Sequence, residues 1–142
     1  MKRKLVLAFG TFDLLHPGHL HYLAQAKRLG SKLVVIVARD VNVRRLKRRK
    51  PVFDESQRLA LVQALKVVDR AVLGFKDDIY KSVARFKPQA LAMGYDQKPS
   101  NRVVERELGK RGLAARILRC KPFKPRRHKS TKIRKRIRLS KA

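Results

Sequence analysis

Two histidines three residues apart, His16 and His19, flank a Pro-Gly pair in the stretch GTFDLLHPGH, residues 10–19. An apolar run precedes this stretch and an amphipathic run follows it, which places it between a strand and a helix. The first backbone N–H groups of a helix have no intrahelical partner and, with the helix dipole, favour an anion. Gly18 has no side chain to obstruct a phosphate. The pattern predicts a phosphate site that both imidazoles face.

The same residues suggest which chemistry the site performs. Imidazoles, either protonated or as hydrogen-bond donors, stabilise negative charge where it grows in a transition state. Thr11 adds a hydroxyl, and Gly10 permits a tight exit from the strand. A metal site is the weaker interpretation, because it needs Asp13 as a third ligand at a spacing that zinc sites do not favour. The other simple alternative is a structural histidine at a helix start, which is the role we expect for His21.

The elements that must position these residues are five predicted strands separated by helices. The strands are short apolar runs: 5–9, 32–38, 70–74, 89–94 and 114–118. Helices are predicted at 18–30, 54–65, 77–86 and 100–112, from apolar spacing and end signals such as the Asp54–Gln57 capping pair, Ser100 and Gly112. Between Arg44 and Lys50 the sequence predicts a basic loop, ended by Pro51.

Alternating strands and helices predict an α/β fold: a Rossmann-like, doubly wound, five-stranded parallel sheet in a single domain, residues 1–142. Ligands of such sheets bind beyond the carboxyl ends of the strands, where the strand order reverses. We therefore expect residues 10–19, the basic loop and GYDQ (94–97) to meet at one edge.

The charge is extreme, with 38 Lys and Arg against 10 Asp and Glu and a net charge of +28. Such a field attracts polyanions such as nucleotides and nucleic acid, although many of these charges can simply be solvated. One cysteine, Cys120, allows no intrachain disulfide and fits a reducing cytoplasm, where we expect the protein. No apolar run reaches membrane-spanning length, and we expect no membrane contact.

The C-terminal segment, residues 119–142, holds twelve Lys or Arg and no acid. Ser130 could cap a short final helix, with Ile133 and Ile137 spaced for docking. The alternative is a disordered basic tail past Ile137.

Five motifs, GTFDLLHPGH, KPVFDESQR, VDRAVLG, GYDQ and STKIR, occur in an order that resembles the nucleotidyltransferases with a His-x-Gly-His signature. These include glycerol-3-phosphate cytidylyltransferase, choline-phosphate cytidylyltransferase and the archaeal FAD synthases. HPGH alone is less specific, because class I aminoacyl-tRNA synthetases carry a similar tetrapeptide. The resemblance implies transfer of a nucleoside monophosphate from a triphosphate to a phosphate-bearing acceptor, with release of pyrophosphate.

The resemblance also implies roles for particular residues. His16 and His19 would be catalytic, Asp96 would hold the sugar or base edge, and Ser130 and Thr131 would begin a helix that meets the β- and γ-phosphates. The full nucleotide-binding set implied is Gly10, Thr11, Phe12, His16, Pro17, Gly18, His19, Asp96, Ser130 and Thr131. The phosphate-neutralising candidates are Lys47, Arg49 and Lys50.

No protein nucleophile is needed, because the acceptor phosphate is already charged. A divalent cation, Mg²⁺, would bridge triphosphate oxygens, and we expect no metal site built of side chains. We expect Asp13 to orient the loop or its histidines, and Arg58 to be structural on its helix. Members of the family that the chain resembles are often dimers, so the resemblance implies that this protein is a homodimer.

Within the family the chain most resembles the archaeal FAD synthases, which convert ATP and FMN into FAD and pyrophosphate. VIVARD, RRKPVFDESQR, KVVDRAVLG and LAMGYDQ carry this resemblance. Cytidylyltransferases more typically have a second acid and a Trp after the fourth strand, where this chain has Tyr95 and Gln97 and no Trp. The archaeal pattern has two C-terminal cysteines, so any redox control by that pair is expected to be absent here.

Two alternative functions stay open. One is a cytidylyltransferase for glycerol 3-phosphate or a related alcohol phosphate. The other is a basic nucleic-acid-binding protein on this scaffold, against which the low aromatic content of 6% argues, because such proteins usually add stacking aromatics. Incidental nucleic-acid binding is compatible with any of these functions.

Overall fold

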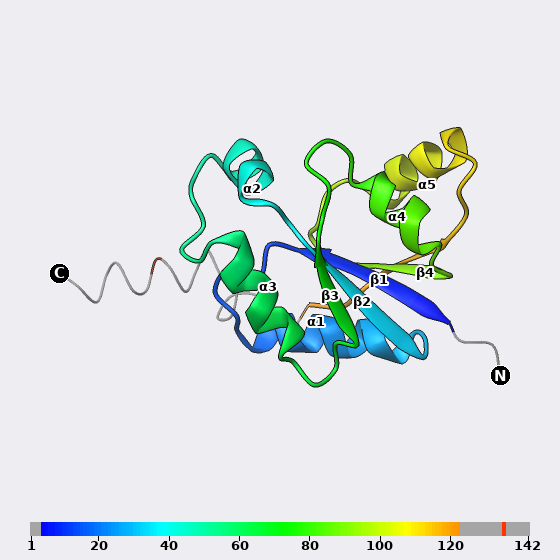
Figure 1. The fold of residues 1–142 in the computed structure, drawn as a ribbon. Coiled ribbons are helices and arrows are strands. Elements are labelled where there is room, and N and C mark those ends of the chain that lie inside the picture. Colours follow the sequence, from blue (N-terminus) through cyan, green and yellow to red (C-terminus); the bar gives the residue numbers. More distant parts are fainter. Residues whose placement is uncertain (1–3, 123–134, 136–142) are drawn as a thin grey trace.

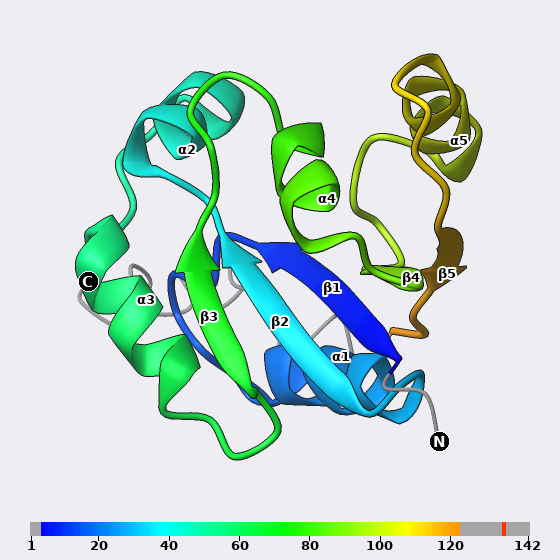
Figure 2. The ribbon, with the colours of Figure 1, turned by 45° about the vertical axis from the view of Figure 1, so that its right-hand side comes forward.

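Five strands form one parallel sheet in the computed structural model, which describes residues 4–122 and Lys135 (Figure 1). They are β1 (Leu5–Gly10), β2 (Lys32–Val37), β3 (Arg70–Leu73), β4 (Ala90–Met93) and β5 (Arg116–Arg119). Their order is β3-β2-β1-β4-β5, which Figure 2 shows face-on. The predicted doubly wound sheet is confirmed, and every predicted strand limit lies within two residues of the observed one.

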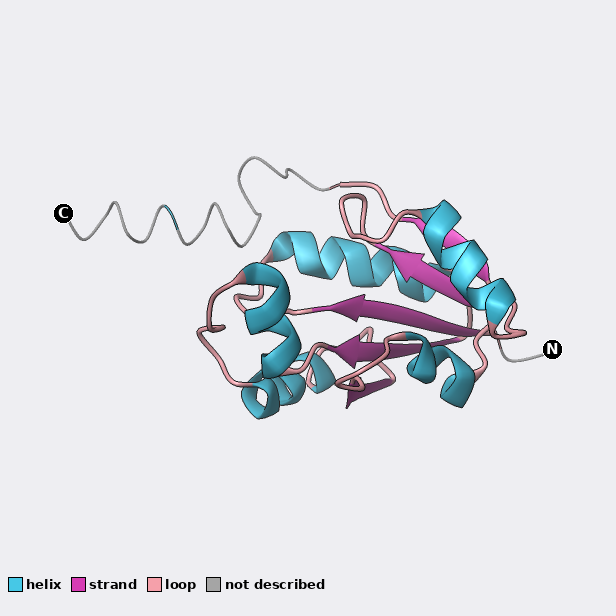
Figure 3. Ribbon diagram, turned by 90° about the horizontal axis from the view of Figure 1, so that it is seen from above, coloured by secondary structure: helices cyan, strands magenta, loops and turns pink. Residues whose placement is uncertain are grey.

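Helices cover both faces of this sheet. They are α1 (Pro17–Arg28), α2 (Asp40–Lys47), α3 (Glu55–Gln63), α4 (Tyr80–Phe86) and α5 (Asn101–Lys110). Because successive strand side chains alternate between faces, Val6 packs in the cluster with α1 and α3, whereas Leu7 packs with α4 and α5. Seen from above, the strands run the same way, so their carboxyl ends share one edge (Figure 3).

The predicted basic loop is wrong for its first half, because Arg44–Lys47 form the end of α2. Asp40 begins this helix, and its last turn holds Arg44, Arg45 and Lys47, so charges of both signs complement the helix dipole. The buried Val43 docks the helix. Arg48, with φ of 54°, ends the helix in the left-handed region, and the loop runs only from there to Pro51.

The C-terminal boundary also needs correction. Arg119 is the last residue of β5, rather than the first of a separate segment, and the backbone N–H of Cys120 still donates to the Met93 carbonyl. The predicted final helix, with Ser130 and Thr131, lies outside the described residues. In the part of the chain that is described, no helix combines the length and apolar character needed to cross a bilayer.

Candidate active site

The strand order reverses between β1 and β4, and a crevice opens there. The two strands pair only from Val6 with Ala90 to Ala8 with Ala92, and separate beyond. The Tyr22 hydroxyl of α1 bridges the gap by donating to the Ala92 carbonyl (2.5 Å) and accepting from the Phe9 N–H (3.1 Å). Burial raises the pKa of Tyr22, so the phenol remains protonated and able to donate. Tyr22 therefore fixes the back of the crevice.

His16 and His19 cap the start of α1 through their Nδ1 atoms. His16 Nδ1 accepts from the Gly18 N–H (3.1 Å), and His19 Nδ1 accepts from the His16 N–H (3.3 Å). This is a capping box built from two imidazoles, with ring centroids 3.9 Å apart. Two backbone N–H groups at the start of the helix, those of His16 and Gly18, are thus held by side chains, and the roles predicted for His16 and Gly18 at the phosphates remain predictions.

This arrangement fixes the protonation of His19. Burial, then the nearby His16 and Lys47, lower its pKa to about 3, so the ring is neutral at physiological pH. Because Nδ1 accepts a hydrogen bond, the single ring proton lies on Nε2. His19 lines the cavity described below. His19 is thus a neutral hydrogen-bond donor in this structure, which is one of the two forms considered for it, and its part in catalysis remains a prediction.

A stability measurement can test this pKa. When the pH is lowered from 6.5 to 5, the free energy of unfolding should fall by about 1.5 kcal/mol because of His19 alone. Its pKa is about 3 when folded but about 6.5 when unfolded, so the unfolded chain binds more protons in this window and stability falls as the pH falls. His19→Gln keeps a capping acceptor at this position and should escape that loss. Urea unfolding of both proteins at the two pH values gives the difference; equal losses would contradict the assignment.

The loop before α1 is folded tightly by Gly10 and Phe12. Phe12 is buried, has a φ of 53°, and places its ring centroid 5.4 Å from that of His19. A Cβ on Gly10 would lie 2.7 Å from the Phe12 ring, which is too close for any other residue without movement. Gly10 therefore leaves room for the Phe12 ring, and Phe12 contacts the His19 ring.

Asp13 joins this loop to the segment before α3. Its two carboxylate oxygens accept the N–H groups of Val52 (2.8 Å) and Phe53 (2.9 Å). The carboxylate thus orients a loop, one of the two roles predicted for it. Among the described residues no three His, Cys, Asp or Glu side chains gather as a metal site, so the zinc interpretation has no support here.

A cavity of about 980 Å³ opens at this edge of the sheet. Its volume lies at the top of the ~300–1,000 Å³ range of small-molecule sites, which leaves room for two ligands. Of the predicted site residues, its lining includes Gly10, Thr11, Phe12, Gly18, His19, Lys47, Arg49 and Asp96. His16, Pro17 and Lys50 are not part of the lining, and Ser130 and Thr131 lie outside the described residues.

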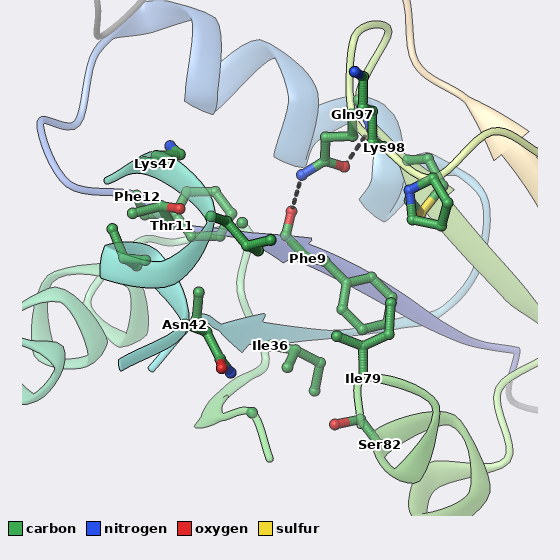
Figure 4. A pocket seen from close by; sticks show the side chains of 18 of the residues that line it. Phe9, Thr11, Phe12, Ile36, Asn42, Lys47, Ile79, Ser82, Gln97 and Lys98 are labelled. Atoms are coloured by element: carbon green, nitrogen blue, oxygen red, sulfur yellow. Dashed lines mark hydrogen bonds between the residues drawn. The ribbon is translucent and has the colours of Figure 1, made fainter. Parts of the chain in front are cut away.

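Two residues that no motif identified as functional, Gln97 and Arg119, hold the loop carrying Asp96. The Gln97 amide donates to the Phe9 carbonyl (2.7 Å) and accepts from the Gly94 N–H (2.7 Å), as Figure 4 shows. The Arg119 guanidinium donates to the carbonyls of Gly94, Gln97 and Pro99, at 2.6–2.8 Å. A long-range partner of this kind leaves no local signal in the sequence.

Comparison with known proteins agrees with this geometry. The family model described as cytidylyltransferase-like matches residues 7–136. The chain belongs to this family. The matched range covers β1 from Leu7 onward, all of the other four strands, and every residue that lines the cavity.

Similar members of the cytidylyltransferase-like family are named FAD synthases. One from Methanosarcina mazei is 52% identical over 114 residues, covering 80% of this chain and 74% of its own length. Another from Archaeoglobus profundus is 49% identical over 133 residues, covering 93% and 84%. A crystal structure from Thermoplasma volcanium, described as a lipopolysaccharide core biosynthesis protein, has a TM-score of 0.82 and 44% identity, covering 86% of this chain and 99% of that one.

Proposed function

We propose that this protein is an FAD synthase, which transfers AMP from ATP to FMN and releases pyrophosphate. The observation that carries the proposal is a neutral, backbone-locked His19 on a cavity large enough for two ligands, at the switch point of the sheet. The choice of ATP and FMN is supported by relatives of about half identical sequence that are named FAD synthases.

The reaction is a direct displacement. An oxygen of the FMN phosphate attacks the α-phosphorus of ATP, and the bond from that phosphorus to the bridging oxygen of the β-phosphate breaks. Negative charge grows on the α-phosphate oxygens and on the departing pyrophosphate. The His19 Nε2–H would donate to an α-phosphate oxygen, where its hydrogen bond strengthens as the charge grows. No side chain has to act as nucleophile or general base.

Basic side chains would bring the two anions together. Lys47 of α2 and Arg49 of the following loop line the cavity, and so does Arg45, which the sequence analysis did not select. Their charges offset the repulsion between the FMN phosphate and the triphosphate. ATP would enter as its complex with a divalent cation, Mg²⁺, bound to the triphosphate oxygens as part of the substrate.

Product analysis tests the proposal. The purified protein is incubated with Mg²⁺, ATP or CTP, and either FMN or glycerol 3-phosphate, and the products are separated by chromatography, because FMN and FAD absorb alike. We expect FAD from ATP and FMN. CDP-glycerol without FAD would establish the cytidylyltransferase alternative. Salt-sensitive RNA binding without either product, persisting in His16→Ala and His19→Ala, would establish the nucleic-acid alternative.

Asp96→Ala should weaken ATP binding by about 10-fold or more, because a carboxylate that accepts from a sugar or base edge contributes about 1.5–3 kcal/mol. The maximal turnover should change much less. The dissociation constant is measured by calorimetry with a non-hydrolysable ATP analogue. Glu105→Ala removes a carboxylate from an exposed position on α5 and serves as the control. An unchanged dissociation constant in Asp96→Ala would remove this residue from the site.

Three further expectations from the sequence remain predictions. We expect a cytoplasmic enzyme, in keeping with its single cysteine. We expect a homodimer, which sedimentation velocity would detect. We also expect the charge of +28 to give incidental, salt-sensitive binding to nucleic acid.

A further inference from the structure

The cavity has two ends of different chemistry. One is the loop of residues 94–99, which carries Asp96 and is polar. The other lies over β2, between α2 and α4, where Ile36, Phe75, Ile79, Tyr80, Ser82 and Val83 line it. The charged Lys76, Asp77 and Asp78 also line the cavity, and both of these carboxylates are held in ion pairs, Asp77 with Lys81 and Asp78 with Arg111. Figure 4 shows Ile79 and Ser82 on one side of this end and Ile36 and Asn42 on the other, with Phe9 between it and Gln97.

Ser82 is a buried polar residue within this end of the cavity. It is only 1% exposed, yet it lines the cavity. In Figure 4 its hydroxyl is directed toward the side on which Ile36 and Asn42 lie. Within residues 4–122 the hydroxyl makes no hydrogen bond, although its backbone N–H donates to the Ile79 carbonyl. A buried hydroxyl without a partner is costly, so a ligand that offers one gains from it.

The neighbouring polar side chain is already engaged. The Asn42 amide nitrogen donates to the Phe75 carbonyl (3.1 Å), and its oxygen accepts from Arg45 (2.7 Å). Asn42 therefore fixes the wall of this end of the cavity. Ser82 is a buried polar group of this end whose hydroxyl can distinguish a ligand with a polar edge from one that is apolar throughout.

We propose that Ser82 determines specificity for the flavin, by hydrogen bonding to the polar edge of its ring system inside the end over β2. This inference rests on the proposed FAD synthase activity and deepens it. The flavin ring has an apolar dimethylbenzene part, which suits Ile36, Phe75 and Ile79, and a pyrimidinedione part with donors and acceptors. A hydroxyl can both donate and accept, so it pairs with either kind of group. The nucleotide then occupies the Asp96 end.

Ser82→Ala tests this assignment, because it removes the hydroxyl and little else. The dissociation constant for FMN, measured by quenching of flavin fluorescence, should rise about five-fold, the effect of one lost neutral hydrogen bond. The value for riboflavin, which has the ring without the phosphate, should rise by the same factor. The value for an ATP analogue should not change. The melting temperature of the ligand-free variant should hold or rise, because an unpaired buried hydroxyl is removed.

Ser31→Ala is the matched control. Ser31 lies at the amino end of β2, away from the cavity, and its hydroxyl accepts from the Lys4 N–H (2.9 Å). This variant should lose stability and bind FMN as the wild type does. A purely structural Ser82 would behave like Ser31, and that result would overturn the inference.

The remaining outcomes separate the two proposals. Weaker ATP binding with unchanged FMN binding in Ser82→Ala would place the adenine here and overturn the inference alone. Wild-type FAD formation with unchanged FMN affinity in Ser82→Ala would do the same. A wild-type protein that neither binds FMN nor forms FAD would overturn both proposals.

Discussion

His19→Ala should lower the maximal turnover by about 10²–10³-fold, the usual effect of removing one donor that stabilises transition-state charge. The dissociation constant for ATP should change by no more than about three-fold, because the interaction strengthens only as charge develops on the α-phosphate. The reason is geometric: with Nδ1 tied to the His16 N–H, the ring presents Nε2–H in one fixed orientation. Steady-state kinetics of FAD formation and calorimetry with an ATP analogue measure the two quantities.

A neighbouring histidine of α1, His21, supplies the control for this experiment. His21→Ala removes an imidazole two residues further along α1 and should leave turnover near the wild-type value. His19→Ala also loses a capping acceptor, at a cost of about 1 kcal/mol, so assays are run well below the midpoint of its thermal unfolding. Parallel losses of affinity and turnover would show that His19 binds ground state and transition state alike, which contradicts the assigned role.

The centre of the sheet could be predicted because strands such as β2 and β4 are buried on both faces. A strand such as β2, with five successive buried residues from Leu33 to Val37, reads as an unbroken apolar run. The start of α3 was equally readable, since Asp54 and Gln57 form the predicted capping box. The helix α2 was missed because its dense positive charge resembles a solvated loop. The sequence signals for this helix were the acidic Asp40 at its start and the cations at its end. The apolar Val43, which the structure buries, was a third.

The sheet topology predicted that residues 10–19, the basic loop and GYDQ meet at one edge of the sheet. The cavity lies at that edge, and its lining includes Gly10, His19 and Asp96, whereas their roles remain predictions. The sequence could not predict that both imidazoles cap the helix through Nδ1 and that His19, but not His16, lines the cavity. The reason is that an imidazole nitrogen can cap a helix as well as bind a phosphate. Tyr22 and Arg119 act on residues far away in the sequence, and such contacts exist only once the sheet has formed.

Arg58 of α3 connects three segments: the loop after β1, the start of α2 and the residues just before α3. The sequence predicted only that this residue is structural. Its side chain is fully buried. It donates to the carbonyls of Thr11 (2.7 Å) and Phe53 (3.0 Å) and pairs with the Asp40 carboxylate (2.7 Å). Burial acts to raise the pKa of Asp40, but the hydrogen bonds from Arg58 and the Glu55 N–H outweigh it and hold that pKa below its ordinary value. One guanidinium thus ties the β1 loop to the starts of α2 and α3.

Arg58→Met should therefore destabilise the fold by about 3–5 kcal/mol, because it leaves the Asp40 charge and two carbonyls without their partner. Urea unfolding measures this loss. Much of it should come from the unpaired carboxylate, so adding Asp40→Asn to Arg58→Met should recover about 1 kcal/mol or more, although Asp40→Asn alone destabilises the wild type. The free energy of unfolding of Arg58→Lys should still be well below that of the wild type, because an ammonium cannot donate to all three acceptors that the planar guanidinium reaches. Strictly additive effects of Arg58→Met and Asp40→Asn would mean that the pair does not interact, and the loop connection assigned to Arg58 would then be wrong.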